Sequence, residues 1–200
     1  MTTLLQINTS LFSGNGQSSQ LANRFVAAWQ EKNAAGKVVV RDLSADPVPH
    51  LDGERFASFL AKPEERTPAQ NDIVAYSDAL IGELKDADVI VLGLPMYNFG
   101  IPSVFKAYLD HVARAGVTFR YTETGPVGLL TGKNVYVFAA RGGKFAGTPL
   151  DSQTDYIRNF FGFLGLNDVE FVYAEGLAMG EEPKQAALAQ AHQQLDRLAA

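Results

Sequence analysis

The sequence predicts an α/β protein in which helices cover both faces of a five-stranded parallel sheet. Segments of strand and helix character alternate along the whole chain. Several strand segments, such as Val89–Leu94, are continuous apolar runs, which are typical of parallel strands buried on both faces. A series of strands separated by helices forms a parallel sheet, and right-handed crossovers place the helices on its two faces.

The first half of the chain contains two strands before this central run. Thr3–Asn8 is a short apolar strand, which a polar loop joins to a helix at Ser19–Asn33 with an apolar face. Lys37–Asp42 contains three consecutive valines and forms the second strand. Asp52–Ala61 is a candidate short helix within a less regular stretch. The helix at 67–85 follows, with proline at its favoured first position.

The second half continues the alternation, with one exception. Val117–Leu130 alternates and then turns, which predicts a hairpin-like excursion between a helix and the next strand. The remaining elements are a helix at Pro102–Ala113, a strand at Asn134–Ala140, a helix at Ser152–Leu164, a strand at Asp168–Ala174 and a closing helix at Glu181–Leu198. The length of 200 residues favours the strand order 2-1-3-4-5 over a six-stranded dinucleotide-binding sheet, and we expect one domain over residues 1–200.

The composition excludes several classes of function. The chain has 17 Lys and Arg against 22 Asp and Glu, a net charge of −5 without a basic stripe, so we expect neither nucleic acid nor a membrane as partner. It has no cysteine, so thiol redox chemistry and cysteine metal sites are excluded, and a bound cofactor must carry any redox function. No histidine pair has metal-ligand spacing, and we expect no metal. Without a signal peptide or a membrane-length apolar run, the expected location is the cytoplasm.

The loop after the first strand is a candidate phosphate site. It leads into a helix N-terminus, where free N–H groups and the helix dipole favour an anion. Its candidate ligands are Ser10, Gly16, Gln17 and Ser18. An ordinary N-cap in a solvated loop is the alternative. The glycines also resemble Gly-x-Gly-x-x-Gly with Ser19 in the last place, while a P-loop is excluded because no Gly-Lys-Ser/Thr follows.

Two further loops follow the third and fourth strands. The first offers a stiff turn with two aromatic residues, one on either side of an asparagine, suited to a planar ring; its residues are Pro95, Met96, Tyr97, Asn98 and Phe99. The second permits close backbone approach to a ligand; its residues are Ala140, Arg141, Gly142 and Gly143. Buried aromatics and a solvated Arg141 in a functionless glycine-rich connection are the alternatives. In a 2-1-3-4-5 sheet the three loops share one crevice, which predicts a mononucleotide with a flat ring, above all FMN.

Four motifs give the chain a family resemblance. They are Pro-Met-Tyr-Asn-Phe at 95–99, Arg-Ala-Gly-Val-Thr-Phe-Arg-Tyr-Thr at 114–122, Arg-Gly-Gly at 141–143 and Ala-Glu-Gly at 174–176. With them the chain resembles the FMN-dependent NAD(P)H azoreductases, within the flavodoxin-like quinone reductases. The resemblance implies a flavodoxin-like three-layer fold and tight, non-covalent FMN. It also implies NADH or NADPH as electron donor and a homodimer with two sites at the subunit interface.

The resemblance also assigns roles to residues. The first loop would hold the phosphate, while Met96–Phe99 and Ala140–Gly143 would contact two edges of the flavin ring. Phe99, Tyr121 and Phe163 would help to form an apolar slot where substrates stack. The implied reaction is a two-electron ping-pong cycle, in which hydride passes through the flavin N5 atom to a quinone or azo compound. No side chain is then expected to be catalytic, although His111 is a candidate neighbour of the site.

Two other functions compete with this interpretation. A non-enzymatic electron carrier of the flavodoxin type is the first, but carriers of that kind typically have a strongly acidic surface and leave the 114–122 segment without a role. A flavin-independent NAD-binding regulatory domain is the second. It would bind a pyrophosphate at Gly14–Ser19 and would leave the 95–102 loop unexplained.

Overall fold

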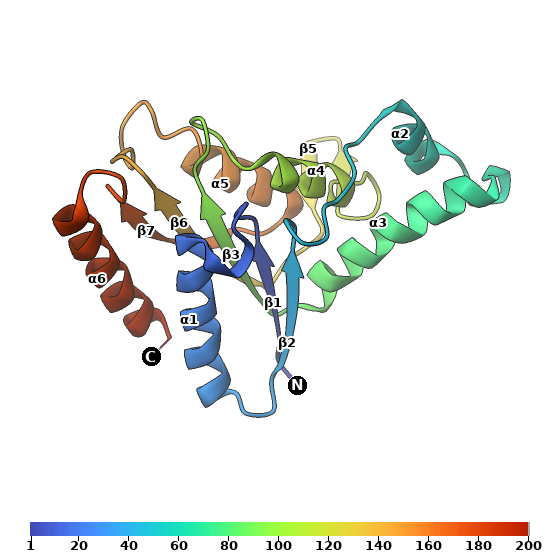
Figure 1. Cartoon of the computed structure of the whole chain (residues 1–200). Coiled ribbons are helices and arrows are strands. Elements are labelled where there is room, and N and C mark those ends of the chain that lie inside the picture. Colours follow the sequence, from blue (N-terminus) through green and yellow to red (C-terminus); the bar gives the residue numbers. More distant parts are fainter. Residues whose placement is uncertain (200) are drawn as a thin grey trace.

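The computed structural model describes residues 1–199 and contains the predicted five-stranded parallel sheet (Figure 1). The strand order is β2-β1-β3-β6-β7, which is the expected 2-1-3-4-5 order once the two hairpin strands are set aside. The sheet strands are β1 (Thr3–Asn8), β2 (Lys37–Asp42), β3 (Val89–Pro95), β6 (Asn134–Arg141) and β7 (Asp168–Glu175). Every residue of β3 is buried, as its continuous apolar run predicts.

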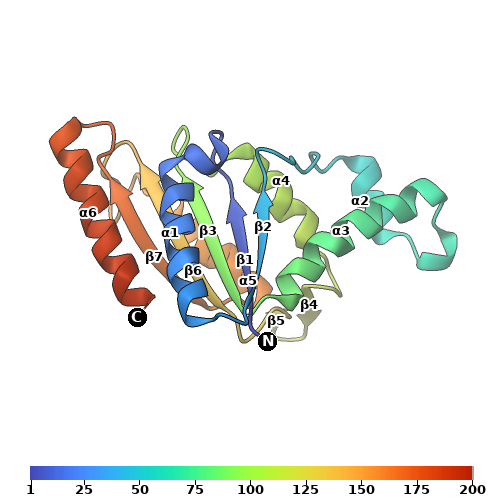
Figure 2. The same cartoon turned by 60° about the horizontal axis from the view of Figure 1, so that its bottom comes forward.

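Helices cover both faces of the sheet (Figure 2). Each face has its own apolar core. On one face lie α1 (Gln17–Lys32) and α6 (Glu181–Leu198), whose Phe25 and Leu195 meet Val91 of β3 within one cluster. On the other face lie α3 (Pro68–Asp86), α4 (Ser103–Val112) and α5 (Thr154–Leu164), which form the larger cluster. The result is a three-layer α/β/α arrangement.

The register of the sheet brings the candidate loops to one edge. Asn8 at the end of β1 pairs with Gly93, and Pro95 at the end of β3 pairs with Ala140. Because the three strands are parallel and adjacent, the chain leaves all of them at the same carboxyl edge. The loops that follow β1, β3 and β6 are therefore neighbours, as the predicted order requires.

The boundaries differ from expectation in a few places. Helix α1 begins at Gln17, two residues earlier than predicted, because Gly16 adopts an extended conformation and acts as its N-cap. The irregular stretch contains α2 (Gly53–Leu60), capped by the Asp52 side chain, and a short 3-10 turn, η2 (Pro63–Glu65). Another short turn, η1 (Ser13–Asn15), precedes α1.

The predicted hairpin forms an antiparallel ribbon of β4 (Phe119–Thr122) and β5 (Gly125–Gly128). It lies at the far end of α4 from the 95–102 loop, and ten residues of helix span about 15 Å. Helix α2 and the N-terminal part of α3 project from the body of the molecule as an arm, while the C-terminal part of α3 packs on the sheet (Figure 2). Among the described residues, no helix is both long enough and apolar enough to cross a membrane.

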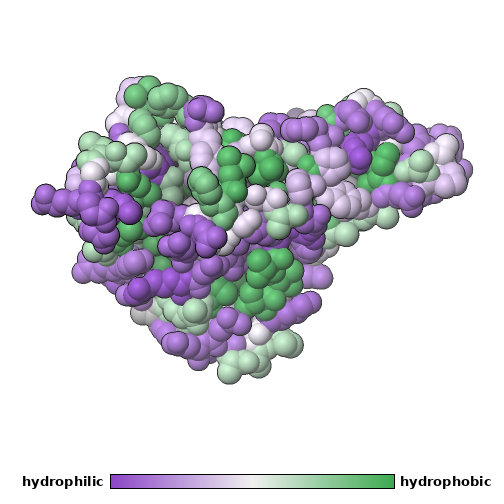
Figure 3. All heavy atoms as spheres, in the orientation of Figure 1, coloured by the Kyte–Doolittle hydropathy of each residue, from purple (hydrophilic) through white to green (hydrophobic). Residues whose placement is uncertain are grey.

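The surface is mainly polar, with separate apolar patches (Figure 3). One patch lies over β2, an edge strand of the sheet, where Val40 is 57% exposed. Other exposed large apolar side chains belong to the α2 arm and to the hairpin; they include Phe56, Leu60, Tyr121 and Val127. The arm and the hairpin thus carry apolar surface that one chain alone does not cover.

Candidate cofactor site

The N-terminus of α1 is built around a close contact between Gly16 and Ser10. A Cβ at position 16 would lie 2.1 Å from the Ser10 Oγ atom, so only glycine fits there. Ser10 is buried, and its hydroxyl lies 3.3 Å from the Tyr97 hydroxyl of the next loop. Within residues 1–199, no side chain caps this helix end. Its first N–H groups therefore remain available to an external acceptor.

Two buried serine hydroxyls point to the nature of that acceptor. The Oγ atoms of Ser18 and Ser19 are fully buried and lack a hydrogen-bond partner among the described residues. A buried hydroxyl without a partner costs about 1–3 kcal/mol, so such groups are normally satisfied. The backbone of Ser18 packs against Gly93 of β3, which fixes the helix end at the sheet edge. A phosphate at this helix N-terminus would supply the acceptor, so the residues present fit the phosphate group of FMN.

The 95–100 loop forms a tight turn with an unusual backbone. Tyr97 and Gly100 exchange both backbone hydrogen bonds, at 3.1 and 2.9 Å. Between them, Asn98 and Phe99 have φ values of +50° and +59°. Two consecutive left-handed residues define a type I′ turn, which normally favours Asn-Gly. A phenylalanine in this conformation is strained. The two bonds of the turn do not use the N–H groups of Asn98 and Phe99, which find no other acceptor within residues 1–199 and are available to a ligand.

The loop after β6 forms the opposite wall. The carbonyl groups of Gly142 and Gly143 accept hydrogen bonds from residues 178 and 176, at 3.0 and 2.9 Å. The Phe145 ring packs so closely on Gly143 that a Cβ there would lie 2.7 Å from it. Phe145 also meets Phe99 edge to face at 5.6 Å. The two loops thus contact each other through their aromatic rings.

Two adjoining cavities follow these loops along the sheet edge. The first, about 340 Å³, is lined by Ser10, Phe12, Asn15, Gly16, Gln17, Pro95, Met96, Tyr97, Ala140, Arg141, Gly142 and Leu177. The second, about 290 Å³, is lined by Met96, Asn98, Phe99, Gly142, Gly143 and Phe145. Met96 and Gly142 belong to both, so the cavities form one strip from the α1 N-terminus to Phe99. The predicted phosphate and ring residues lie along this strip, with Ser18 buried at its α1 end.

Arg141 differs from its expected surroundings. Its guanidinium is fully buried and forms ion pairs with Asp151 at 2.9 Å and Glu175 at 3.0 Å. It also lies over the Tyr173 ring at 5.1 Å. The alternative of a solvated arginine is therefore wrong, and the guanidinium is engaged inside the protein rather than offered to a ligand.

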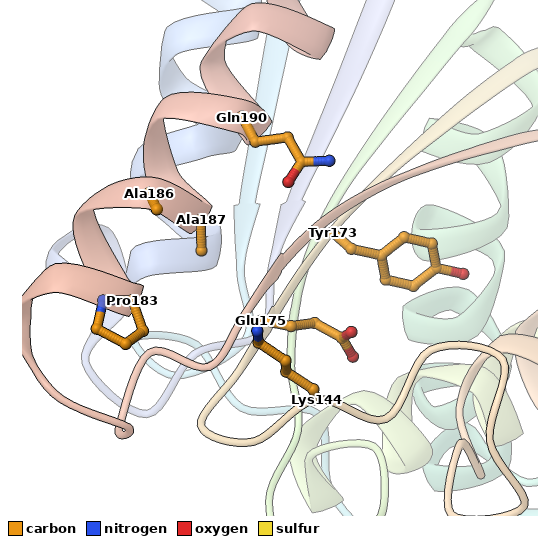
Figure 4. A pocket seen from close by; sticks show the side chains of 7 residues that line it. All are labelled: Lys144, Tyr173, Glu175, Pro183, Ala186, Ala187 and Gln190. Carbon is orange, nitrogen blue, oxygen red and sulfur yellow. The ribbon is translucent and has the colours of Figure 1, made fainter.

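A third cavity lies outside the strip, between β7, the 142–147 loop and α6 (Figure 4). It measures about 340 Å³. Lys144 and Gln190 contribute polar side chains to its lining, whereas the Tyr173 and Glu175 side chains point away from α6, towards Thr154 and Arg141. None of the sequence-predicted site residues lines it.

The expected substrate slot is divided in a single chain. Tyr121 and Phe163 come together on either side of Phe119, at ring distances of 5.6 and 4.2 Å. Phe99 lies in the cavity strip instead, at the other end of α4. The structure of one chain therefore does not bring Phe99 into contact with the other two rings. Tyr121 lines a separate apolar cavity of about 330 Å³ beside α2.

His111 is not part of the cavity strip. It is fully buried between Phe59 and Tyr76, and its Nδ1 atom lies 3.0 Å from the Ala107 carbonyl oxygen. This bond makes Nδ1 the donor and leaves Nε2, which has no partner among the described residues, as an acceptor. Burial lowers the pKa of His111 below its ordinary value, so the ring is neutral near pH 7.

Sequence reasoning missed several residues of the strip and one beside it. Phe12, Asn15 and Phe145 line the strip and lie in the loops that the sequence singles out, but their residue types alone did not mark them as ligand contacts. Leu177 directly follows the Ala-Glu-Gly motif at 174–176. Gln153 lies at the start of α5 and donates to the carbonyl groups of Pro95 and Gly100. The sequence pattern of this helix indicates its apolar face but gives no role to a polar residue at its start.

The fold, with its site at the carboxyl edge of a doubly covered parallel sheet, places the protein in the flavodoxin-like class. A family model described as a flavodoxin-like fold matches residues 2–199. The chain is 55% identical over 197 residues to an FMN-dependent NADH:quinone oxidoreductase of Cellvibrio japonicus, covering 98% of each chain. It is 58% identical over 193 residues to FMN-dependent NADH:quinone oxidoreductase 6 of Burkholderia lata, covering 96% of this chain and 98% of the relative. It therefore belongs to the family of FMN-dependent NADH:quinone oxidoreductases and azoreductases.

A solved structure agrees with this assignment. The FMN-dependent NADH-azoreductase from Bacillus anthracis, solved in complex with FMN, matches with a TM-score of 0.88 at 28% identity, and the match covers all of both chains. Another solved structure, of an azoreductase from Bacillus anthracis strain Sterne, matches with a TM-score of 0.91 at 27% identity, covering 100% of this chain and 99% of the other.

Proposed function

We propose that the chain, as one FMN-binding domain over residues 1–200, catalyses NADH-dependent two-electron reduction of quinones and azo compounds. The observation that carries this proposal is the continuous cavity strip, which joins an uncapped helix N-terminus to a strained aromatic turn. The strip offers an anion site at one end and a flat, partly apolar site at the other. FMN has a phosphate and a planar ring, so its shape and charge match both ends.

The phosphate of FMN would be bound without the help of a cationic side chain. Ser10, Gly16, Gln17 and Ser18 would bind the phosphate through their hydroxyl and backbone N–H groups. In the part of the chain that the structure describes, the only cation that lines the strip is Arg141, and its guanidinium is already paired with two carboxylates. The α1 dipole and its free N–H groups thus provide the attraction.

The ring end would be held by two backbone walls. Pro95–Phe99 form one wall, and Ala140–Gly143 form the other. When bound, FMN supplies the hydride chemistry, which no side chain of this protein can provide. The free N–H groups of Asn98 and Phe99 would stabilise negative charge that develops on the adjacent ring edge. A flat nicotinamide and a flat acceptor would then occupy the same slot beside Phe99 in turn, in a ping-pong cycle.

The substrate slot is the reason to propose a homodimer. Tyr121 is 74% exposed at the hairpin, and both Tyr121 and Phe163 pack on Phe119, while Phe99 lies at the other end of α4. A second copy that places its hairpin over the ring site would unite the three aromatic residues and cover their apolar surface. We also place the enzyme in the cytoplasm, where NADH is available as a soluble reductant.

An anaerobic visible spectrum tests this function. The protein is saturated with FMN, passed through gel filtration and examined before and after the addition of NADH. Retained flavin absorbance that bleaches with NADH and returns with a quinone supports the proposal. Retained flavin that neither NADH nor NADPH bleaches would support a non-enzymatic electron carrier, and loss of flavin on the column would contradict FMN binding.

A further inference from the structure

The Gln153 side chain is completely buried behind the 95–100 turn, at the start of α5. Its Nε2 atom donates to the carbonyl oxygens of Pro95 and Gly100, at 2.9 and 3.0 Å. These two carbonyls lie at the beginning and the end of the turn. The preceding residue, Ser152, donates its hydroxyl to the carbonyl oxygen of Phe99. Two successive residues of the chain thus hold three carbonyl groups of one short turn.

Arg141 fixes which way the Gln153 amide faces. Its Nε atom donates to the Gln153 Oε1 atom at 3.2 Å. Because a guanidinium can only donate, the amide oxygen must face Arg141, and the amide nitrogen must face the turn. The guanidinium itself is held by Asp151 and Glu175. The orientation of the amide is therefore set by a chain of buried bonds rather than by packing alone.

The same buried cation also reaches the opposite wall of the cavity strip. The Glu175 Oε1 atom, which pairs with Arg141, accepts the backbone N–H groups of Phe145 and Ala146, each at 2.9 Å. One network thus connects the turn on one side of the ring site to the glycine-rich loop on the other. A fixed spacing between the two walls follows from these bonds.

The turn needs external support because Phe99 stands in the left-handed region, with φ of +59°. This conformation is unfavourable for a bulky residue and persists only when surrounding bonds determine it. Resting on the proposed FMN function, we propose that Gln153, oriented by Arg141 and assisted by Ser152, is a positioning residue for the flavin. It holds the strained turn in the conformation that presents Asn98 and Phe99 to the ring.

The substitution Gln153→Glu tests this role with little change in volume. Glutamate keeps the oxygen that faces Arg141, but an ionised carboxylate cannot donate to Pro95 and Gly100. The matched control is Gln190→Glu on α6, an exposed residue at the neighbouring cavity that lies away from the turn (Figure 4). Both variants are titrated as apoproteins with FMN by flavin fluorescence. The visible circular dichroism of the saturated proteins is then recorded, because it reports how rigidly the ring is held.

We expect Gln153→Glu to raise the FMN dissociation constant about tenfold or more, since two hydrogen bonds to the turn are lost. We also expect it to reduce the visible circular dichroism of bound FMN, with Gln190→Glu unchanged in both measurements. In the Phe99→Gly background the turn becomes Asn-Gly, which adopts the type I′ form without support. There the effect of Gln153→Glu should shrink to about threefold or less, a coupling that a general loss of stability would not produce.

Each result decides the question. Wild-type FMN affinity and circular dichroism in Gln153→Glu, or an equal loss in the Phe99→Gly background, would overturn the positioning role alone. If Gln153→Glu fails to fold, Ser152→Ala decides instead, because Ser152 is exposed: an increase of about threefold supports the role, and an unchanged dissociation constant contradicts it. A wild-type chain without affinity for FMN would overturn the proposed function and this inference together.

Discussion

Gly16 and Ser10 approach so closely that a single methyl group on Gly16 would lie 2.1 Å from the Ser10 hydroxyl oxygen. The contact joins the N-cap of α1 to the loop after β1, beside a first helical turn that no side chain caps within residues 1–199. A methyl group on Gly14, two residues earlier, would meet no atom within 4 Å among the described residues. The two glycines therefore provide a matched pair of substitutions.

Gly16→Ala should displace Ser10 and weaken FMN binding, while Gly14→Ala should bind FMN as the wild type does. Overpacking of a closed site typically costs about 1–3 kcal/mol, and we expect a loss of affinity of that order. Fluorescence titration of the two apoproteins with FMN measures the difference. Equal affinities for both variants would show that this helix end does not hold the phosphate.

Ser18→Asp should abolish FMN binding without unfolding the protein. A carboxylate at the α1 N-terminus would repel the phosphate, and it would itself be stabilised by the helix dipole and the free N–H groups. At about 4 Å and an effective dielectric of 20, two like charges repel by roughly 4 kcal/mol. The loss of affinity should therefore exceed a factor of about 100.

The control for this variant is Ser103→Asp, an exposed position in the first turn of α4. It introduces the same charge at another helix N-terminus and should leave FMN binding unchanged. Thermal unfolding of both apoproteins shows whether the fold is retained. Undiminished FMN affinity in a folded Ser18→Asp variant would remove this loop from the cofactor site.

The proposed dimer predicts that two defective chains can restore activity to each other. One variant carries Asn98→Ala and Phe99→Ala in the turn, and the other carries Tyr121→Ala in the hairpin. If each slot takes its turn from one chain and its hairpin from the partner, half of the randomly mixed dimers contain one intact slot. Mixing equal amounts by refolding should then recover about a quarter of the wild-type sites.

NADH-dependent quinone reduction by the mixture, compared with each variant alone, measures this recovery. Sedimentation equilibrium establishes that the mixed protein is dimeric. If the slot belonged to a single chain, the mixture would show only the average of the two low activities.

His111 should make the fold less stable as the pH falls. Burial is the largest cause and lowers the pKa of His111, and the positive charge of Arg55 lowers it further. The hydrogen bond to the Ala107 carbonyl group and the negative charges of Asp110 and Asp52 act in the opposite direction without reversing the shift. The unfolded chain, with a histidine pKa near 6.5, binds the proton more readily than the folded chain. The stabilising contribution is therefore complete above about pH 6.5 and is lost as the pH falls through 6.5 towards the lowered folded pKa.

Chemical denaturation between pH 7.5 and 5 measures this contribution. His111→Asn can retain a donor to the Ala107 carbonyl group but does not titrate, so its stability should fall less steeply with decreasing pH than that of the wild type. His192→Asn on α6 is the matched histidine-to-asparagine substitution for comparison. Identical slopes for wild type and His111→Asn would contradict the effect.

The strand order and the place of the cofactor site could be predicted because they depend on short-range patterns. Val89–Leu94 is apolar throughout, and only a strand covered on both faces accommodates such a run without exposing it. Loops after β1, β3 and β6 must then share an edge, since parallel neighbours end on the same side. For the same reason the residues selected in those loops line one continuous strip, apart from Ser18, which is buried at its α1 end.

The residues that hold this strip in shape could not be predicted in the same way. Gln153 and Arg141 lie far from the turn in sequence, and the bonds that connect them depend on how α5 packs against the sheet. Ser18 could be named as a candidate, but only the structure shows that its hydroxyl is buried without a partner among the described residues. The left-handed backbone of Phe99 runs against the preference of its residue type, so no local rule predicts it.

The sequence by itself determined the three-layer fold, the sheet edge that carries the candidate cofactor site and the class of cofactor, because apolar periodicity and loop composition act over a few residues. Tertiary structure alone decided that Arg141 is a buried structural cation, that Gln153 donates to both ends of the 95–100 turn, and that Tyr121 lies apart from Phe99 within one chain. These features depend on contacts between distant segments, whose geometry is set by the packing of whole elements rather than by the residues beside them in the sequence.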